Sequence, residues 1–136
     1  MTELYVPDTN VIFDVLNQQE TVINHYRESV GREAKFVLCP VVYFEVVRGF
    51  VHRPDPDDER AFAVLASGWR WEDLQRSDWH LASELWADGQ GSGRRPSDAD
   101  ALIAAFARNR GAMLVTADVK AFDHLSVATA NWRAED

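Results

Sequence analysis

The chain has 136 residues, and a chain of this mass buries about 68% of its unfolded surface, so we expect residues 1–136 to form a single domain. Hydrophobic residues make up 46% and charged residues 26%, which excludes a disordered or collagen-like chain. A lone Cys39 excludes an internal disulfide, and the net charge of −8 opposes a surface that is basic all over. Contact with nucleic acid must then be local, and Arg94 and Arg95 are candidates to meet phosphates.

The first half of the chain alternates between short apolar runs and helical patterns. In chain order these predict a strand over 4–6, a turn over 7–10, helices over 11–16 and 20–30, a strand over 36–39 and a helix over 40–52. Pro40 suits the first position of a helix. The helix it begins is apolar on nearly every face, so we expect it to be largely buried.

The second half continues the alternation. It predicts a helix over 58–66, a short strand over 69–71, a helix over 78–87 capped by Ser77, a mobile glycine-rich loop over 89–96, a helix from Ser97 to 109 and a strand over 113–116. Such alternation favours an α/β fold with a parallel sheet covered by helices on both faces, whose sites lie at the carboxyl ends of strands. No export signal or membrane span is visible, so we expect a cytoplasmic protein.

Two acidic residues occupy positions where this rule expects a site, and a third stands out inside a helix. Asp8 follows the first predicted strand, and Asp118 lies two residues beyond the last residue of the 113–116 strand. Either could instead serve a turn or a helix cap. Glu45 is the only acidic residue in a helix that is otherwise apolar, where its alternative role is an ion pair with Arg48 one turn away.

Two further carboxylates, Asp98 and Asp100, open the helix that Ser97 caps. The positive end of the helix dipole favours acids there for structural reasons, and Asp100 could complete a capping box with Ser97. The two acids fall on opposite edges of the apolar arc of this helix, so we expect only one to reach a common site. Periodicity alone does not choose between them.

Converging carboxylates would need a cation. Two unit charges about 4 Å apart repel by about 4 kcal/mol at an effective dielectric constant of 20. An all-oxygen site suits Mg²⁺ or Mn²⁺, which can activate a water for phosphodiester hydrolysis without a side-chain nucleophile. The chain fits this chemistry because it has no Gly-x-Ser-x-Gly elbow and no P-loop, and its four histidines are scattered.

These residues resemble the acidic motifs of PIN domains, and most closely those of VapC-type toxin ribonucleases. The similarity runs from residue 4 to about 125 and rests on Val6-Pro7-Asp8-Thr9-Asn10, on Glu45 followed by Val46-Val47-Arg48-Gly49, on Asp100 followed by Ala101-Leu102-Ile103-Ala104-Ala105, and on Thr116-Ala117-Asp118. It implies a three-layer α/β/α fold with a central parallel sheet, and an endoribonuclease that uses Mg²⁺ or Mn²⁺. It also implies a homodimer that a small VapB-type antitoxin neutralises.

Carried over residue by residue, the resemblance implies an acidic quartet of catalytic metal ligands. The quartet is Asp8, Glu45, Asp100 and Asp118, with Thr9, Asn10, Thr116 and Asp98 in supporting positions. It selects Asp100 over Asp98 because the family's acid directly precedes the apolar run. The acidic net charge is a departure from what an RNA-binding protein leads us to expect, and the RNA-binding surface stays unassigned.

Other classes remain as alternatives. A haloacid-dehalogenase-type enzyme needs a second Asp two residues after Asp8, where this chain has Asn10, and a receiver domain needs an adjacent acidic pair, where it has Pro7. A non-catalytic module with an acidic cleft and a stand-alone PIN nuclease of RNA processing also fit the pattern. Several tryptophans before the glycine-rich loop, including Trp79 and Trp86, predict an apolar surface for self-association or a partner.

Overall fold

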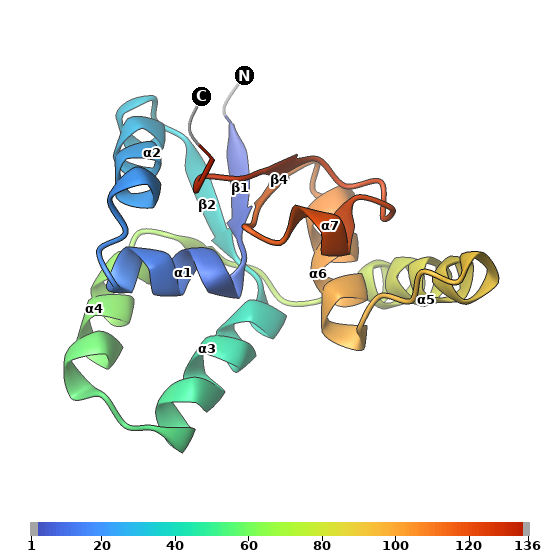
Figure 1. Cartoon of the computed structure of the whole chain (residues 1–136), viewed down its shortest axis with the longest axis horizontal. Coiled ribbons are helices and arrows are strands. Elements are labelled where there is room, and N and C mark those ends of the chain that lie inside the picture. Colours follow the sequence, from blue (N-terminus) through green and yellow to red (C-terminus); the bar gives the residue numbers. More distant parts are fainter. Residues whose placement is uncertain (1–2, 135–136) are drawn as a thin grey trace.

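The computed structural model describes residues 3–134 and confirms an α/β fold around one parallel sheet. The strand order is β3-β2-β1-β4-β5, with β1 (Leu4–Pro7), β2 (Lys35–Leu38), β3 (Arg70–Trp71), β4 (Met113–Val115) and β5 (Thr129–Ala130). The helices are α1 (Thr9–Leu16), α2 (Glu20–Gly31), α3 (Pro40–His52), α4 (Pro56–Ala66), α5 (Arg76–Ser92), α6 (Asp98–Asn109) and α7 (Val119–Phe122). Figure 1 shows α2 on one side of the sheet and α6 on the other.

Successive side chains of a strand point to opposite faces of the sheet, and here both faces carry buried apolar side chains. On one face Tyr5 and Phe36 stack with ring centroids 5.6 Å apart, and Trp132 meets Tyr5 edge-on at 5.8 Å. On the other face Val6 and Leu114 belong to the larger core that α3, α5 and α6 complete. The predicted three layers are therefore present, with helices, sheet and helices in that order.

The sheet has its switch point between β1 and β4. From β1 the chain adds β2 and then β3 on one side, whereas β4 and β5 lie on the other. Pro7 pairs with Val115, so the two strands end at the same level and the next residues, Asp8 and Thr116, emerge side by side. Open parallel sheets bind ligands in the crevice at such a point, beyond the carboxyl ends of the strands.

The structure corrects the expected helix over 78–87 and the glycine-rich loop after it. Helix α5 runs from Arg76 to Ser92, and its N-cap is Gln75 in place of the predicted Ser77. Gly89 lies inside this helix, where the chain folds back against it. A Cβ at this position would come within 2.5 Å of Pro96 Cδ, which explains why the residue is glycine. The helix ends at Gly93, whose φ of +76° favours glycine. The predicted loop therefore contributes its first half to a helix.

Helix α3 has the predicted bounds, but the expectation that it is largely buried is wrong. Phe44 is 60% exposed and Val51 is 76% exposed, so one face of the helix meets solvent. Helix α1 begins at Thr9 rather than at residue 11, and α4 begins at Pro56 rather than at residue 58. Helix α7 and strand β5 were not predicted, since each spans too few residues to show a period. Among residues 3–134, no helix combines the length and apolarity needed to cross a membrane.

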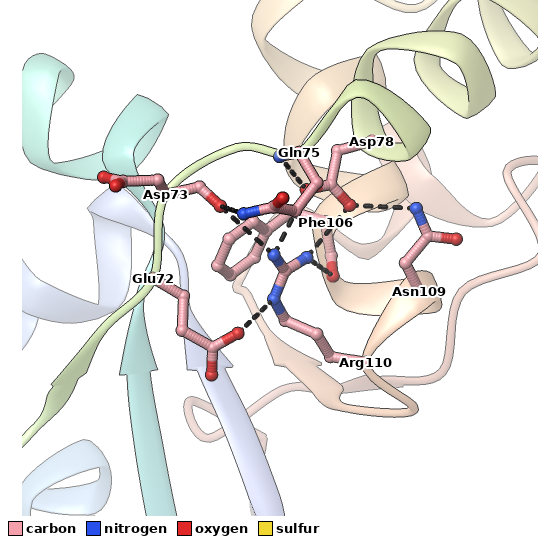
Figure 2. A network of polar contacts seen from close by, with 7 residues as sticks. All are labelled: Glu72, Asp73, Gln75, Asp78, Phe106, Asn109 and Arg110. Atoms are coloured by element: carbon pink, nitrogen blue, oxygen red, sulfur yellow. Dashed lines mark hydrogen bonds and ion pairs between the residues drawn. The ribbon is translucent and has the colours of Figure 1, made fainter.

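A buried ion-pair network fixes α5 against the carboxyl end of α6 (Figure 2). Two nitrogens of Arg110 contact the two oxygens of Asp78, at 2.9 and 3.1 Å, and a third donates to Glu72 at 2.8 Å. The Arg110 guanidinium also lies 3.6 Å from the centroid of the Phe106 ring. Asn109 adds a hydrogen bond of 2.9 Å to Asp78, which is almost fully buried. Because α6 carries Asp98 and Asp100 at its other end, this network helps to fix where those acids lie.

Candidate active site

Asp8 lies at the carboxyl end of β1 and caps the first turn of α1. Its Oδ1 accepts a hydrogen bond from the backbone N–H of Thr9 at 2.8 Å, and its Oδ2 accepts one from the Thr116 hydroxyl at 2.8 Å. The backbone N–H of Asp8 donates to the Val115 carbonyl, also at 2.8 Å. Only 7% of this residue is exposed, and its contact with the Thr9 N–H shows that the alternative role as a helix cap is present.

Asn10 ties the first turn of α1 to the segment that follows β4. Its Oδ1 accepts a hydrogen bond from the backbone N–H of Ala117 at 3.1 Å, and its Nδ2 donates to the Thr116 hydroxyl oxygen at 3.3 Å. The backbone N–H of Asp118 donates to the same hydroxyl oxygen at 3.1 Å. Thr116 therefore connects Asp8, Asn10 and Asp118, although 106 residues or more separate the first two from it.

Glu45 reaches the same region from α3. The Thr9 hydroxyl donates to Glu45 Oε1 at 2.8 Å, which links this helix to the residue after Asp8. The other oxygen, Oε2, lies 3.6 Å from an Arg48 nitrogen, so the alternative ion pair is also present. The Arg48 side chain is 61% exposed, so solvent reaches this side of α3 beside Glu45. Arg48 is thus a cation at the edge of the acidic group that sequence reasoning treated only as a competing partner.

The two acids at the start of α6 have different surroundings. Asp100 is half-buried, and its backbone N–H donates to the capping hydroxyl of Ser97 at 3.0 Å. The pKa of Asp100 is raised to about 6, chiefly by burial and also by the charges of Asp8, Glu45 and Asp118, against the lowering effect of the Ser97 hydrogen bond. Asp98 is exposed and lines two apolar grooves, one of which Glu45 also lines.

The charges act on Asp8 in the same direction. Burial is the largest influence and raises the pKa of Asp8, whereas the hydrogen bonds from Thr116 and Thr9 lower it. The nearby charges of Glu45 and Asp118 then raise it. The structure therefore brings the four acids of the expected quartet within electrostatic reach of one another, and it leaves Asp98 at the rim.

The donor set suits a hard divalent cation, because it consists of carboxylate oxygens supported by hydroxyl and amide oxygens. A cation among these acids would relieve the repulsion that raises the pKa values of Asp8 and Asp100. Within residues 3–134, no group of three or more His, Cys, Asp or Glu side chains is already close enough to hold a metal ion. The fit therefore rests on the chemistry and charge of the side chains.

Comparisons with known proteins agree with this fold. The sequence matches the model of the PIN domain over residues 5–128. No curated protein matches it. The structure is similar to VapBC2 from Rickettsia felis bound to a DNA fragment from their promoter, with a TM-score of 0.85 and 20% identity over 95% of this chain and 98% of that chain.

Two further solved structures have the same fold. VapBC-1 from nontypeable Haemophilus influenzae gives a TM-score of 0.83 at 20% identity, covering 96% of this chain and 99% of that one. VapBC-5 from Mycobacterium tuberculosis, a member of the VapBC family of toxin-antitoxin systems, gives 0.67 at 19% identity, covering 93% and 95%. The family match spans nearly the whole chain and includes all four acids of the expected quartet. This chain belongs to the PIN domain family.

Proposed function

We propose that the chain is a Mg²⁺- or Mn²⁺-dependent endoribonuclease, built as one nuclease domain, that hydrolyses RNA phosphodiester bonds. The observation that carries this proposal is the electrostatic grouping of four acids at the switch point of the sheet. The charges of Asp8, Glu45 and Asp118 all act on the half-buried Asp100, whose pKa lies near 6. Membership of a family whose members are in general nucleases supports the same activity.

In this proposal the quartet holds the ion, and neighbouring polar groups hold the quartet. Asp8, Glu45, Asp100 and Asp118 are the ligands. When bound, the ion orients and deprotonates a water and stabilises negative charge on the phosphoryl oxygen. Thr116 and the Thr9 backbone fix both oxygens of Asp8, and the Thr9 hydroxyl fixes one oxygen of Glu45. Such outer contacts orient the ligands, and removing one typically lowers metal affinity or activity by about 10- to 100-fold.

Cleavage of single-stranded RNA by the purified chain tests the activity. We expect cleavage with Mg²⁺ or Mn²⁺ and none with EDTA. The alternative, a non-catalytic module with an acidic cleft, predicts that the chain binds metal or a basic peptide while RNA stays intact at every metal concentration. A contaminating nuclease is excluded if Asp8→Asn, purified in the same way, fails to cleave.

We further propose that the chain is the toxin of a VapB-type pair and acts in the cytoplasm. Its fold resembles solved VapBC structures, and an apolar surface borders the acidic site. This surface joins two grooves of about 390 and 320 Å³ that share Leu102 and Asp98. Its exposed aromatic members are Phe44 on α3 and Trp79 and Trp86 on α5, in agreement with the tryptophan-based expectation. Exposed apolar patches next to a site are typical of partner surfaces.

Two measurements test the partner and the oligomer. Phe44→Asp should weaken a complex with a co-expressed VapB-type antitoxin, whereas Val64→Asp on α4, where the side chain is 74% exposed, is the matched control. Sedimentation tests the expected homodimer, and a monomer at micromolar concentration contradicts it. Growth arrest on expression without antitoxin favours a toxin, whereas unaffected growth with retained cleavage favours a stand-alone nuclease of RNA processing.

A further inference from the structure

A pocket that none of the four acids lines lies between the last turns of α5, the end of α6 and the segment after α7. Its volume is about 440 Å³, far above the roughly 10–15 Å³ that one water needs. Its polar lining consists of Asp88, Ser92, Arg94, Arg108, His124 and Ser126. We call it the Arg94–Arg108 pocket. The chain has a net charge of −8, but this pocket brings two arginines and a histidine together.

His124 forms part of the pocket wall. Its side chain is only 16% exposed, and within residues 3–134 neither buried ring nitrogen has a hydrogen-bond partner. Nδ1 lies 3.5 Å from an Asp123 oxygen, outside hydrogen-bonding geometry. Buried polar groups without partners are rare in proteins because they lose their contacts with water and gain none in return. The exposed part of this side chain is therefore carbon, and the ring borders the pocket without presenting a nitrogen to it.

The two arginines have donors to spare. Arg94 contacts the Lys120 carbonyl and Asp123 through a single nitrogen, at 3.4 and 2.5 Å. Arg108 donates to the Leu125 carbonyl at 3.2 Å, also through one nitrogen. A guanidinium carries five N–H donors, so the described contacts leave several donors of each arginine available. Arginine binds phosphate oxygens through paired N–H groups, which makes a phosphate the anion that best matches this lining.

The pocket also adjoins the acidic site along the chain. Arg94 contacts the carbonyl of Lys120, which is only two residues beyond Asp118. Two residues span at most about 7 Å, so the carbonyl that Arg94 contacts is close to Asp118. Helix α7, which carries Lys120, packs against α6 in Figure 1. The pocket is therefore close enough to Asp118 for a neighbouring phosphate of the same strand to be the natural occupant, because phosphates recur along every RNA strand.

We propose that the Arg94–Arg108 pocket binds a backbone phosphate of the RNA strand whose neighbouring bond meets the acidic quartet. This inference rests on the proposed nuclease function and assigns the RNA contact that the acidic composition left open. It makes Arg94 and Arg108 substrate-binding residues with His124 in the pocket wall, and it gives none of them a part in the bond-breaking step. Asp88 faces the same pocket and limits its positive charge, which favours one phosphate over a longer anionic stretch.

Equilibrium binding of a fluorescent single-stranded RNA, in EDTA so that no bond is cut, tests the proposal. We expect Arg94→Ala and Arg108→Ala each to weaken binding about 10-fold, the size typical of a charged hydrogen bond. Each should also reduce the slope of log affinity against log salt by about 0.7, one phosphate contact on a single strand. The control is Arg27→Ala. Arg27 is an exposed residue of α2, at the other end of the molecule, so its removal should change neither the affinity nor the salt dependence. Melting temperatures verify that every variant is folded.

The second arm follows the His124 ring resonances of the wild-type chain during titration with inorganic phosphate. Shifts that RNA also produces, together with weakened RNA binding by both arginine variants, support the proposal. Phosphate shifts without any change in RNA binding by the variants mean that the pocket takes a small free phosphate, which overturns the backbone assignment. The absence of both effects overturns the site itself. Weakened RNA binding by a chain that never cleaves RNA with metal leaves this pocket standing and defeats the proposed nuclease function.

Discussion

The carboxyl groups at the two ends of α6 have pKa values shifted in opposite directions. At the amino end, Asp100 is half-buried among three other carboxylates, and burial with their charges raises its pKa to about 6. At the carboxyl end, burial also acts to raise the pKa of Asp78, but hydrogen bonds from Arg110, Gln75 and Asn109 outweigh it and lower the pKa. Mutually repelling carboxylates therefore lie at one end of α6, and at the other end lies a carboxylate that is paired with Arg110 and hydrogen-bonded.

The difference shows what each end does. Buried charges are tolerated when they are paired and hydrogen-bonded, as Asp78 is with Arg110. Like charges left without a cation destabilise the chain, and such repulsion persists where function requires it. The Asp78 end therefore stabilises the packing of α5 on α6, and the Asp100 end is the candidate for chemistry. Five experiments test this division, in order of decreasing effect.

The largest effect is expected for Asp8→Asn, which should abolish metal-dependent RNA cleavage while the chain stays folded. The substitution removes a proposed ligand but keeps an oxygen that can accept from the Thr9 backbone. The loss should exceed the approximately 100-fold change that an outer contact of a metal site causes. Initial cleavage rates and circular dichroism measure both properties. Wild-type cleavage by this variant defeats the assignment of Asp8.

Arg110→Met should cause the largest loss of stability. The methionine keeps an apolar contact with Phe106 but leaves the buried Asp78 without its cation, which typically destabilises a fold by about 3–5 kcal/mol. Chemical denaturation measures the free energy of unfolding. The control is Arg60→Met, because Arg60 pairs with Asp57 in full exposure and should change stability by less than about 1 kcal/mol. Equal effects of the two substitutions contradict a stabilising role for the network.

Mg²⁺ or Mn²⁺ should raise the melting temperature of the wild-type chain. A ligand that binds only the folded state at 100 times its dissociation constant stabilises it by about 2.7 kcal/mol. The gain should be absent in Asp8→Asn and retained in Arg110→Met, since the second change lies at the other end of α6. Differential scanning calorimetry at matched ionic strength measures it. An unchanged melting temperature at millimolar metal argues against a metal site.

Asp100→Asn should raise the stability of the metal-free chain at pH 7 by about 1 kcal/mol, after solvent screening of the charges is allowed for, and should abolish cleavage. Asp98→Asn is the matched control at the exposed position two residues earlier, and it should leave cleavage nearly intact. If Asp100 serves only as a cap partner, its substitution loses about 1 kcal/mol and spares activity. An inactive Asp98→Asn variant means that the wrong acid was chosen.

The smallest effect concerns pH. Because the folded pKa of Asp100 is about 6 and the ordinary value is 3.8, the folded chain binds this proton more tightly than the unfolded chain. Destabilisation by the ionised carboxyl is complete above about pH 6 and disappears as the pH falls towards 4. The stability difference between Asp100→Asn and wild type should therefore shrink over that range. A difference that is constant from pH 7 to 4 contradicts the raised pKa.

Local patterns were enough to predict most of the strands and helices. The apolar runs before Asp8 and Thr116 are strands, and Ser97 caps α6 as its sequence indicates. Helix α5 was predicted too short because Gly89 usually weakens a helix. In the folded chain that glycine makes room for Pro96, a contact that no local rule contains. The exposed face of α3 was missed for a related reason, since apolarity alone does not tell which face a neighbour covers.

The sequence by itself determined the alternation of strands and helices, and with it the place of Asp8 and Asp118 after two strands that parallel sheets bring together. Only the tertiary structure decided which acid at the start of α6 comes under the charge of the others, and that Arg110 neutralises Asp78 from 32 positions away. It also gathered Arg94, Arg108 and His124 into one pocket. The physical reason is that hydrogen bonding and apolar periodicity act within a few residues, whereas burial and charge depend on every segment that the fold brings near.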